Sequence, residues 1–142
     1  MITLIFSLIL FFTFTLLGSF HIYWLLGGTW GVKKVIPTKN NQLKSVAIPK
    51  FATVIVAAVL ILFGFVYLVK TELINIELPN IVIEYGYWFI PCIFIIRAIG
   101  EFNYVGFFKK IKGTEFAKAD SKIFSPLCLG IGILGILIQT IK

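Results

Sequence analysis

The chain has 142 residues, of which 59% are hydrophobic and only 13% are charged, and its formal net charge is +7. A soluble domain carries about 25% charged residues, so the composition excludes an ordinary water-solvated surface. The lysines lie between apolar runs and the aromatic residues lie within them, whereas a nucleic-acid-binding surface interleaves the two. We therefore expect a membrane protein whose lysines face lipid headgroups, with no nucleic-acid partner.

Four apolar segments are long enough to cross a bilayer, which takes about 20 helical residues. The first is too long for a signal peptide, lacks a basic start and is followed by no small-residue cleavage site. The last begins at Ser125-Pro126, a serine N-cap followed by a proline at the first helical position. The sequence thus predicts four transmembrane helices, over about residues 2–26, 51–69, 85–108 and 125–141.

The distribution of lysines predicts the orientation. The two loops at 27–50 and 109–124 hold ten of the twelve lysines, whereas the loop between the second and third helices holds Lys70 and three glutamates. With four crossings both lysine-rich loops share one side, which the positive-inside rule places in the cytoplasm. We expect one all-α domain over residues 1–142, a polytopic four-transmembrane-helix bundle with both termini outside.

Ionisable residues inside the third predicted helix are the first candidates for a functional site. Arg97 and Glu101 are four residues apart and so share a helix face, with Tyr104 nearly one turn further on. Charged groups at membrane depth normally face the bundle interior, paired or wetted, and we expect Arg97 near mid-membrane. The pair either forms a site for a proton, an ion or a lipid headgroup, or neutralises itself and locks helices together.

Three further residues complete the candidate site. His21 is the only histidine, one turn before Trp24; its imidazole suits a proton relay or an interhelical hydrogen bond. Asp120 precedes the fourth helix and is either a group at the cytoplasmic mouth of the site or a solvated loop carboxylate, which we favour. The predicted polar cluster in the cytoplasmic half comprises His21, Trp24, Arg97, Glu101, Tyr104 and Asp120.

The segment Gly130-Ile-Gly132-Ile-Leu-Gly135 spells a nucleotide-binding pattern, but no strand precedes it and it lies within an apolar crossing. Glycines there, like Ala57 and Gly64 on the second helix, favour close approach of helices. No metal-ligand cluster, P-loop or catalytic triad is present in the sequence. We predict no cofactor and no metal, and we lean against an enzyme.

Several segments are similar to a known family, namely His21-Ile-Tyr-Trp24-Leu-Leu-Gly27-Gly28, the run from Arg97 to Lys110, Phe116-Ala-Lys-Ala-Asp120, and Ser125-Pro126-Leu-Cys128. They resemble small four-span bacterial membrane proteins of a domain of unknown function, number 3995. The resemblance covers nearly the whole chain. It implies a multi-pass protein of the bacterial inner membrane and implies no activity.

Three functions follow from these observations. The polar cluster binds or translocates a proton, an ion or a lipid headgroup. Alternatively, the chain is a scaffold or accessory subunit whose glycine faces pack on a protein partner or on a second copy. A third possibility is a membrane enzyme acting on a lipid or quinone, with His21 or Glu101 as general acid or base.

Overall fold

The computed structural model describes residues 1–28, 30, 50–100, 102 and 105–141, and all of their regular structure is helical. Four helical stretches of these residues are long and apolar enough to cross a membrane, which confirms the predicted all-α architecture. The elements in chain order are α1 (Ile2–Leu25), α3 (Lys50–Lys70), the π-helical turn η1 (Val82–Gly86), α4 (Tyr87–Ile99), α5 (Glu115–Ala119), the π-helical turn η2 (Asp120–Phe124) and α6 (Ser125–Thr140).

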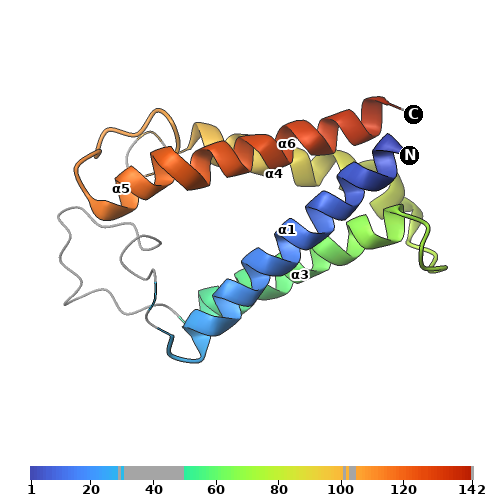
Figure 1. Ribbon diagram of the computed structural model, residues 1–142, viewed down its shortest axis with the longest axis horizontal. Helices are drawn as coiled ribbons and strands as arrows, with labels where there is room; N and C mark the ends of the chain where they lie inside the picture. Colours follow the sequence, from blue (N-terminus) through green and yellow to red (C-terminus); the bar gives the residue numbers. More distant parts are fainter. Residues whose placement is uncertain (29, 31–49, 101, 103–104, 142) are drawn as a thin grey trace.

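The helices form two hairpins. The most extensive contacts pair α1 with α3 and α4 with α6. Figure 1 shows the two pairs close together at one end, where both chain termini and the connection from α3 to η1 lie, and diverging toward the other end, where α5 lies. We call these the terminal end and the lysine-rich end, because Lys50 and five lysines between residues 109 and 122 belong to the second.

Small residues let the helices of each hairpin approach closely. A Cβ added at Gly18 of α1 would lie 2.8 Å from a side-chain carbon of Ile61 on α3. On α6, a Cβ at Gly132 would lie 2.3 Å from the side chain of Ile95 and one at Gly135 would lie 2.6 Å from Pro91. These glycines serve helix packing, as the sequence predicted for Gly132 and Gly135 but not for Gly18.

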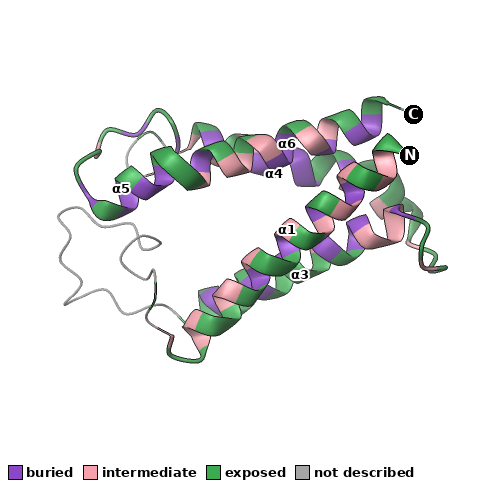
Figure 2. Ribbon diagram, in the orientation of Figure 1, coloured by how far each residue is buried: buried purple, intermediate pink, exposed green. Residues whose placement is uncertain are grey.

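An aromatic layer joins the two hairpins. The ring of Phe14 on α1 lies 5.8 Å from Phe63 and 5.9 Å from Tyr67 on α3, and 5.2 Å from Phe94 on α4, between centroids. Phe14 and Tyr67 are completely buried. Figure 2 shows buried residues on the facing sides of the helices and exposed residues on the outward sides, many of which are large and apolar. Lipid suits such outward faces.

The third helix ends earlier than the sequence predicted, at Ile99 rather than about residue 108. Gly100 has a φ of +84° and Gly106 one of +92°. The chain closes on itself there, because a Cβ at Gly106 would lie 2.3 Å from the Ile99 carbonyl oxygen and the Phe107 N–H donates to the Ala98 carbonyl at 2.8 Å. Only glycine fits this crossing, since it has no Cβ and readily adopts positive φ.

The fourth helical stretch begins earlier than predicted, at Glu115 rather than about residue 125. Its N-cap is Thr114, whose hydroxyl accepts a hydrogen bond from the Ala117 N–H at 3.0 Å. Ser125 is therefore not an N-cap. Pro126 has no N–H to continue the α-helical hydrogen bonds, and the π-helical turn η2 immediately precedes Ser125 and Pro126 in the uninterrupted stretch.

Candidate functional site

The carboxylate of Asp120 lies at the centre of a group of side-chain and backbone donors at the lysine-rich end. Its Oδ1 accepts a hydrogen bond from Arg97 Nη2 at 2.8 Å. Its Oδ2 accepts from the Gly106 N–H at 2.8 Å, from Ser125 Oγ at 3.0 Å and from Lys109 Nζ at 3.2 Å. Asp120 is completely buried. Three of its four donors bond Oδ2 and one bonds Oδ1, so both oxygens of the carboxylate accept hydrogen bonds. We call these five residues the Asp120 cage.

Lys109 is the buried cation of the cage, with 2% of its surface exposed. Besides Asp120, its Nζ donates to the Gly106 carbonyl at 2.9 Å and to Ser121 Oγ. An ammonium group has three N–H donors, and all three find acceptors. A buried charge is tolerated when it is paired and hydrogen-bonded in this way, so the cage fixes the segment after α4 onto the start of η2.

Arg97 is less completely paired than Lys109. Its side chain is 31% exposed, and among the described residues its Nη1 is buried and has no hydrogen-bond partner. A guanidinium carries five N–H donors in a planar fork. The cage holds two cations and one carboxylate and so keeps one excess positive charge.

The cage lies near one end of the helical stretches of its hairpin and not at their middle. Asp120 is twenty residues from Thr140 in a continuous helical stretch, or about 30 Å at 1.5 Å per residue, which equals the thickness of a typical core. Arg97 lies in the last turn of α4. Arg97 thus lies near the end of its helix, because the third helix is shorter than predicted, and its depth in a membrane stays a prediction.

The structure separates the described residues of the predicted polar cluster into two groups: Arg97 and Asp120 on one hairpin, and His21 and Trp24 on the other. Arg97 and Asp120 form an ion pair, whereas Glu101 and Tyr104 lie outside the described residues. The preference for Asp120 as a solvated loop carboxylate is wrong, because Asp120 begins η2 and is covered by its own donors. The predicted continuation of α4 that would have placed Arg97 and Glu101 on one helix face is also absent, since α4 ends at Ile99.

His21 and Trp24 lie on the other hairpin. His21 Nδ1 hydrogen-bonds the Leu17 carbonyl of its own helix at 2.8 Å, and its ring meets the Trp24 ring edge-on at 5.3 Å. Trp24 Nε1 donates to the Trp30 carbonyl at 2.8 Å. The described bond of His21 is thus within α1 and not interhelical. In the described part of the chain, no three His, Cys, Asp or Glu side chains gather to hold a metal.

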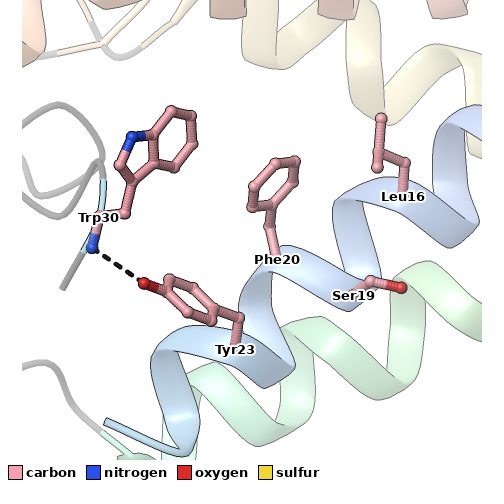
Figure 3. A pocket seen from close by; sticks show the side chains of 5 residues that line it. All are labelled: Leu16, Ser19, Phe20, Tyr23 and Trp30. Carbon is pink, nitrogen blue, oxygen red and sulfur yellow. Dashed lines mark hydrogen bonds between the residues drawn. The ribbon is translucent and has the colours of Figure 1, made fainter. Parts of the chain in front are cut away.

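An open, mainly apolar pocket of about 340 Å³ lies between the second half of α1 and Trp30. Figure 3 shows its lining residues: Leu16, Ser19, Phe20, Tyr23 and Trp30. The Trp30 N–H donates to the Tyr23 hydroxyl at 3.3 Å, and Phe20 stacks on Trp30 with centroids 5.8 Å apart. These bonds hold the start of the α1–α3 connection against α1, and we call this the α1 pocket.

Sequence analysis missed three members of the cage. Lys109 has the same immediate sequence context as the exposed Lys110 and was counted only as a topology signal. Ser125 was interpreted as a helix cap. Gly106 acts through its backbone N–H, which no residue pattern reveals; the available signal was the pair Gly100 and Gly106, which is typical of a tight crossing in a helix-free segment.

A second buried polar group lies at the terminal end, and we call it the Tyr87 cluster: Ser7, Tyr67, Lys70, Tyr87 and Gln139. Lys70 Nζ donates to Gln139 Oε1 at 3.1 Å and lies 4.2 Å from the centroid of the Tyr87 ring. The Tyr87 hydroxyl donates to the Val66 carbonyl at 3.1 Å. The hydroxyls of Ser7 and Tyr67 are buried without a hydrogen-bond partner among the described residues.

Comparison with known proteins gives one match. Residues 14–135 match the model of a family described as "Protein of unknown function (DUF3995)". No curated protein and no solved structure matches the chain.

Proposed function

The chain belongs to the DUF3995 family of proteins of unknown function, and we propose that this integral membrane protein binds the phosphate of an anionic lipid headgroup at Arg97 of the Asp120 cage. The observation that carries this proposal is the incomplete pairing of Arg97. Its side chain is 31% exposed, and one described hydrogen bond, to Asp120, uses one of its five donors.

The chemistry of the cage suits phosphate. A guanidinium recognises phosphate through paired, charge-assisted hydrogen bonds, and the excess positive charge of the cage attracts an anion. Exposed lysines lie near the cage in sequence, namely Lys110, Lys112, Lys118 and Lys122, and basic residues next to a membrane attract anionic lipids. A cage at the end of a helical stretch about as long as the hydrocarbon core is thick also lies at the depth of lipid phosphates.

Binding is better supported than translocation. The four donors around Asp120 stabilise its charged form, and so disfavour the uptake of a transported proton at this carboxylate. Beyond the cage, the aromatic layer of Phe14, Phe63 and Phe94 lies between the two hairpins. By the positive-inside rule, the bound headgroup belongs to the cytoplasmic leaflet.

Native mass spectrometry of the detergent-solubilised protein tests the proposal. We expect the wild type to retain phosphatidylglycerol more strongly than phosphatidylcholine, and Arg97→Gln to lose about tenfold in that preference, as removal of one charge-assisted contact predicts. Lys112→Gln changes the net charge equally at an exposed site outside the cage and should lose much less of the preference than Arg97→Gln. Arg97→Lys, which keeps the charge but not the fork, should be intermediate.

The outcome is decided by the difference between the two glutamine variants. Retention of wild-type selectivity by Arg97→Gln contradicts the proposal, as does an equal loss in Arg97→Gln and Lys112→Gln, which would indicate attraction by net charge alone. Thermal unfolding of each variant shows whether a loss of lipid selectivity arises from misfolding. If Arg97→Gln misfolds, the selectivity of Arg97→Lys relative to the wild type decides.

A further inference from the structure

Among the described residues, two hydrogen bonds between the two hairpins lie at the terminal end. They join Lys70 to Gln139 and Tyr87 to Val66, and the Phe14–Phe94 contact lies further along. Beyond that contact the helix pairs diverge toward the lysine-rich end (Figure 1). In agreement with this, α1 makes its extensive contacts with α3 and α6 and not with α4 in the described part of the chain.

Arg97 lies on the same face of α4 as Phe94, and its guanidinium bonds Asp120 of its own hairpin. Residues three and four apart share a helix face, so Ile90, Phe94 and Arg97 form one stripe along α4. Ile90 is buried, and Phe94 contacts both Phe14 and Phe63 of the other hairpin. Arg97 continues this stripe by one turn toward the lysine-rich end, past the last aromatic contact.

The α1 pocket lies at a matching depth on the other hairpin. Both positions are measured along the helix axis from the Phe14–Phe94 contact. Phe20 follows Phe14 by six residues, which is about 9 Å along α1. Arg97 follows Phe94 by three residues, which is about 4.5 Å along α4. In Figure 3 the side chains of Leu16, Phe20 and Trp30 project to the side of α1 on which the α4–α6 hairpin lies. One hairpin therefore offers apolar surface and the other a cation.

We propose that one anionic phospholipid lies between the diverging hairpins, with its phosphate on Arg97 and an acyl chain on Leu16 and Phe20 of the α1 pocket. This inference rests on the proposed function, and it adds that the lipid is held between helices and not in the surrounding bilayer. Charge complementarity selects an anionic lipid, since the cage carries an excess positive charge and the five pocket residues carry none.

Photocrosslinking of the full chain in phosphatidylcholine vesicles tests the proposal. The probe is phosphatidylglycerol with a diazirine in its acyl chain, added as a minor component. We expect more adducts in the peptide that contains Leu16 and Phe20 than at residues 54–56 of α3. Residues 54–56 are exposed and apolar, so their labelling reports ordinary contact with the bilayer. Arg97→Gln should reduce the first signal about tenfold and leave the second unchanged.

A blocking variant supplies a second measurement. Ser19 lines the pocket and is exposed, so Ser19→Trp should fill the pocket and lower both the crosslinking of α1 and the retention of phosphatidylglycerol. Val54→Trp, at an exposed site on α3, should change neither.

The possible results separate the two proposals. In one result, Arg97→Gln loses lipid selectivity, but neither Arg97→Gln nor Ser19→Trp changes the crosslinking of α1. The proposal of a lipid between the hairpins is then wrong, and the proposal of headgroup binding at Arg97 stands. If Arg97→Gln keeps its selectivity, both are wrong. Equal labelling of α1 and α3 in the wild type also overturns the intercalated lipid.

Discussion

The Asp120 cage and the Tyr87 cluster are both buried polar groups in an apolar bundle, but they connect different parts of it. The cage joins α4, the segment after it and the η2–α6 stretch, which all belong to one hairpin. The Tyr87 cluster joins α3 to α4 and α6, and so connects the two hairpins. The hairpins are close where the polar bonds cross between them and diverge where these bonds stay within one hairpin.

The two groups also differ in charge and in completeness. The cage pairs full charges and gives both carboxylate oxygens of Asp120 a hydrogen-bond donor. The Tyr87 cluster has one cation, amide and phenol groups, and two hydroxyls without described partners. Removing a member of a buried ion pair leaves an uncompensated charge; removing a hydroxyl that makes no bond costs little. The comparison thus predicts large effects at the cage and small ones at the cluster.

The largest effect is expected for Asp120→Asn. The amide keeps the shape of the side chain but leaves the buried Lys109 without a counter-ion, which should reduce the free energy of unfolding by about 3–5 kcal/mol. Chemical denaturation in detergent measures this. Glu84→Gln, at an exposed carboxylate of η1, is the control and should change stability little. Equal stability of the two variants would show that the cage contributes nothing.

A smaller effect is expected for Gly106→Ala. The substitution forces a Cβ at positive φ and against the Ile99 carbonyl, which should cost about 1–3 kcal/mol. The matched control is Gly113→Ala, because a Cβ there meets nothing within 4 Å. Thermal unfolding and hydrogen exchange of the Phe107 amide measure the change, and identical behaviour of the two alanine variants would contradict the closed crossing.

The smallest effect is expected in a pair of tyrosine variants of the Tyr87 cluster. Tyr87→Phe removes the hydrogen bond to the Val66 carbonyl and should cost about 0.5–1.5 kcal/mol. Tyr67→Phe removes a buried hydroxyl with no described partner and should be neutral or stabilising. Denaturant unfolding compares them, and a larger loss for Tyr67→Phe would reverse the assignment of bonded and unbonded hydroxyls.

The four crossings could be predicted from the sequence because length and hydropathy decide them, and because apolar runs such as residues 51–69 have no other way to satisfy their backbone in lipid. Gly132 and Gly135 of α6 were correctly assigned to packing, whereas a Cβ added at Gly130 would meet nothing within 4 Å. The ends of the third and fourth helices could not be predicted. Hydropathy continues through Val105 and Phe107, and only the positive φ of Gly100, a backbone property, ends α4 at Ile99.

Two of the five cage residues could be found from the sequence and three could not. Arg97 and Asp120 were singled out because ionisable groups in or beside apolar segments are costly. Their pairing across 23 residues depends on the Gly100–Gly106 crossing, which returns the chain to α4 and brings the Gly106 N–H and Lys109 to Asp120. Such non-local closure leaves no periodic signal.

The burial of Lys109 has a consequence for the chemistry of its neighbour in sequence. Lys109 and Lys110 are adjacent, yet the first is buried and hydrogen-bonded while the second is exposed. Acylating reagents require a free, accessible amine, so Lys109 becomes reactive only in molecules whose cage has opened by local unfolding. The dipeptide therefore carries its own internal reference, and the ratio of modification at the two amines reports how often this end of the protein opens in an intact membrane.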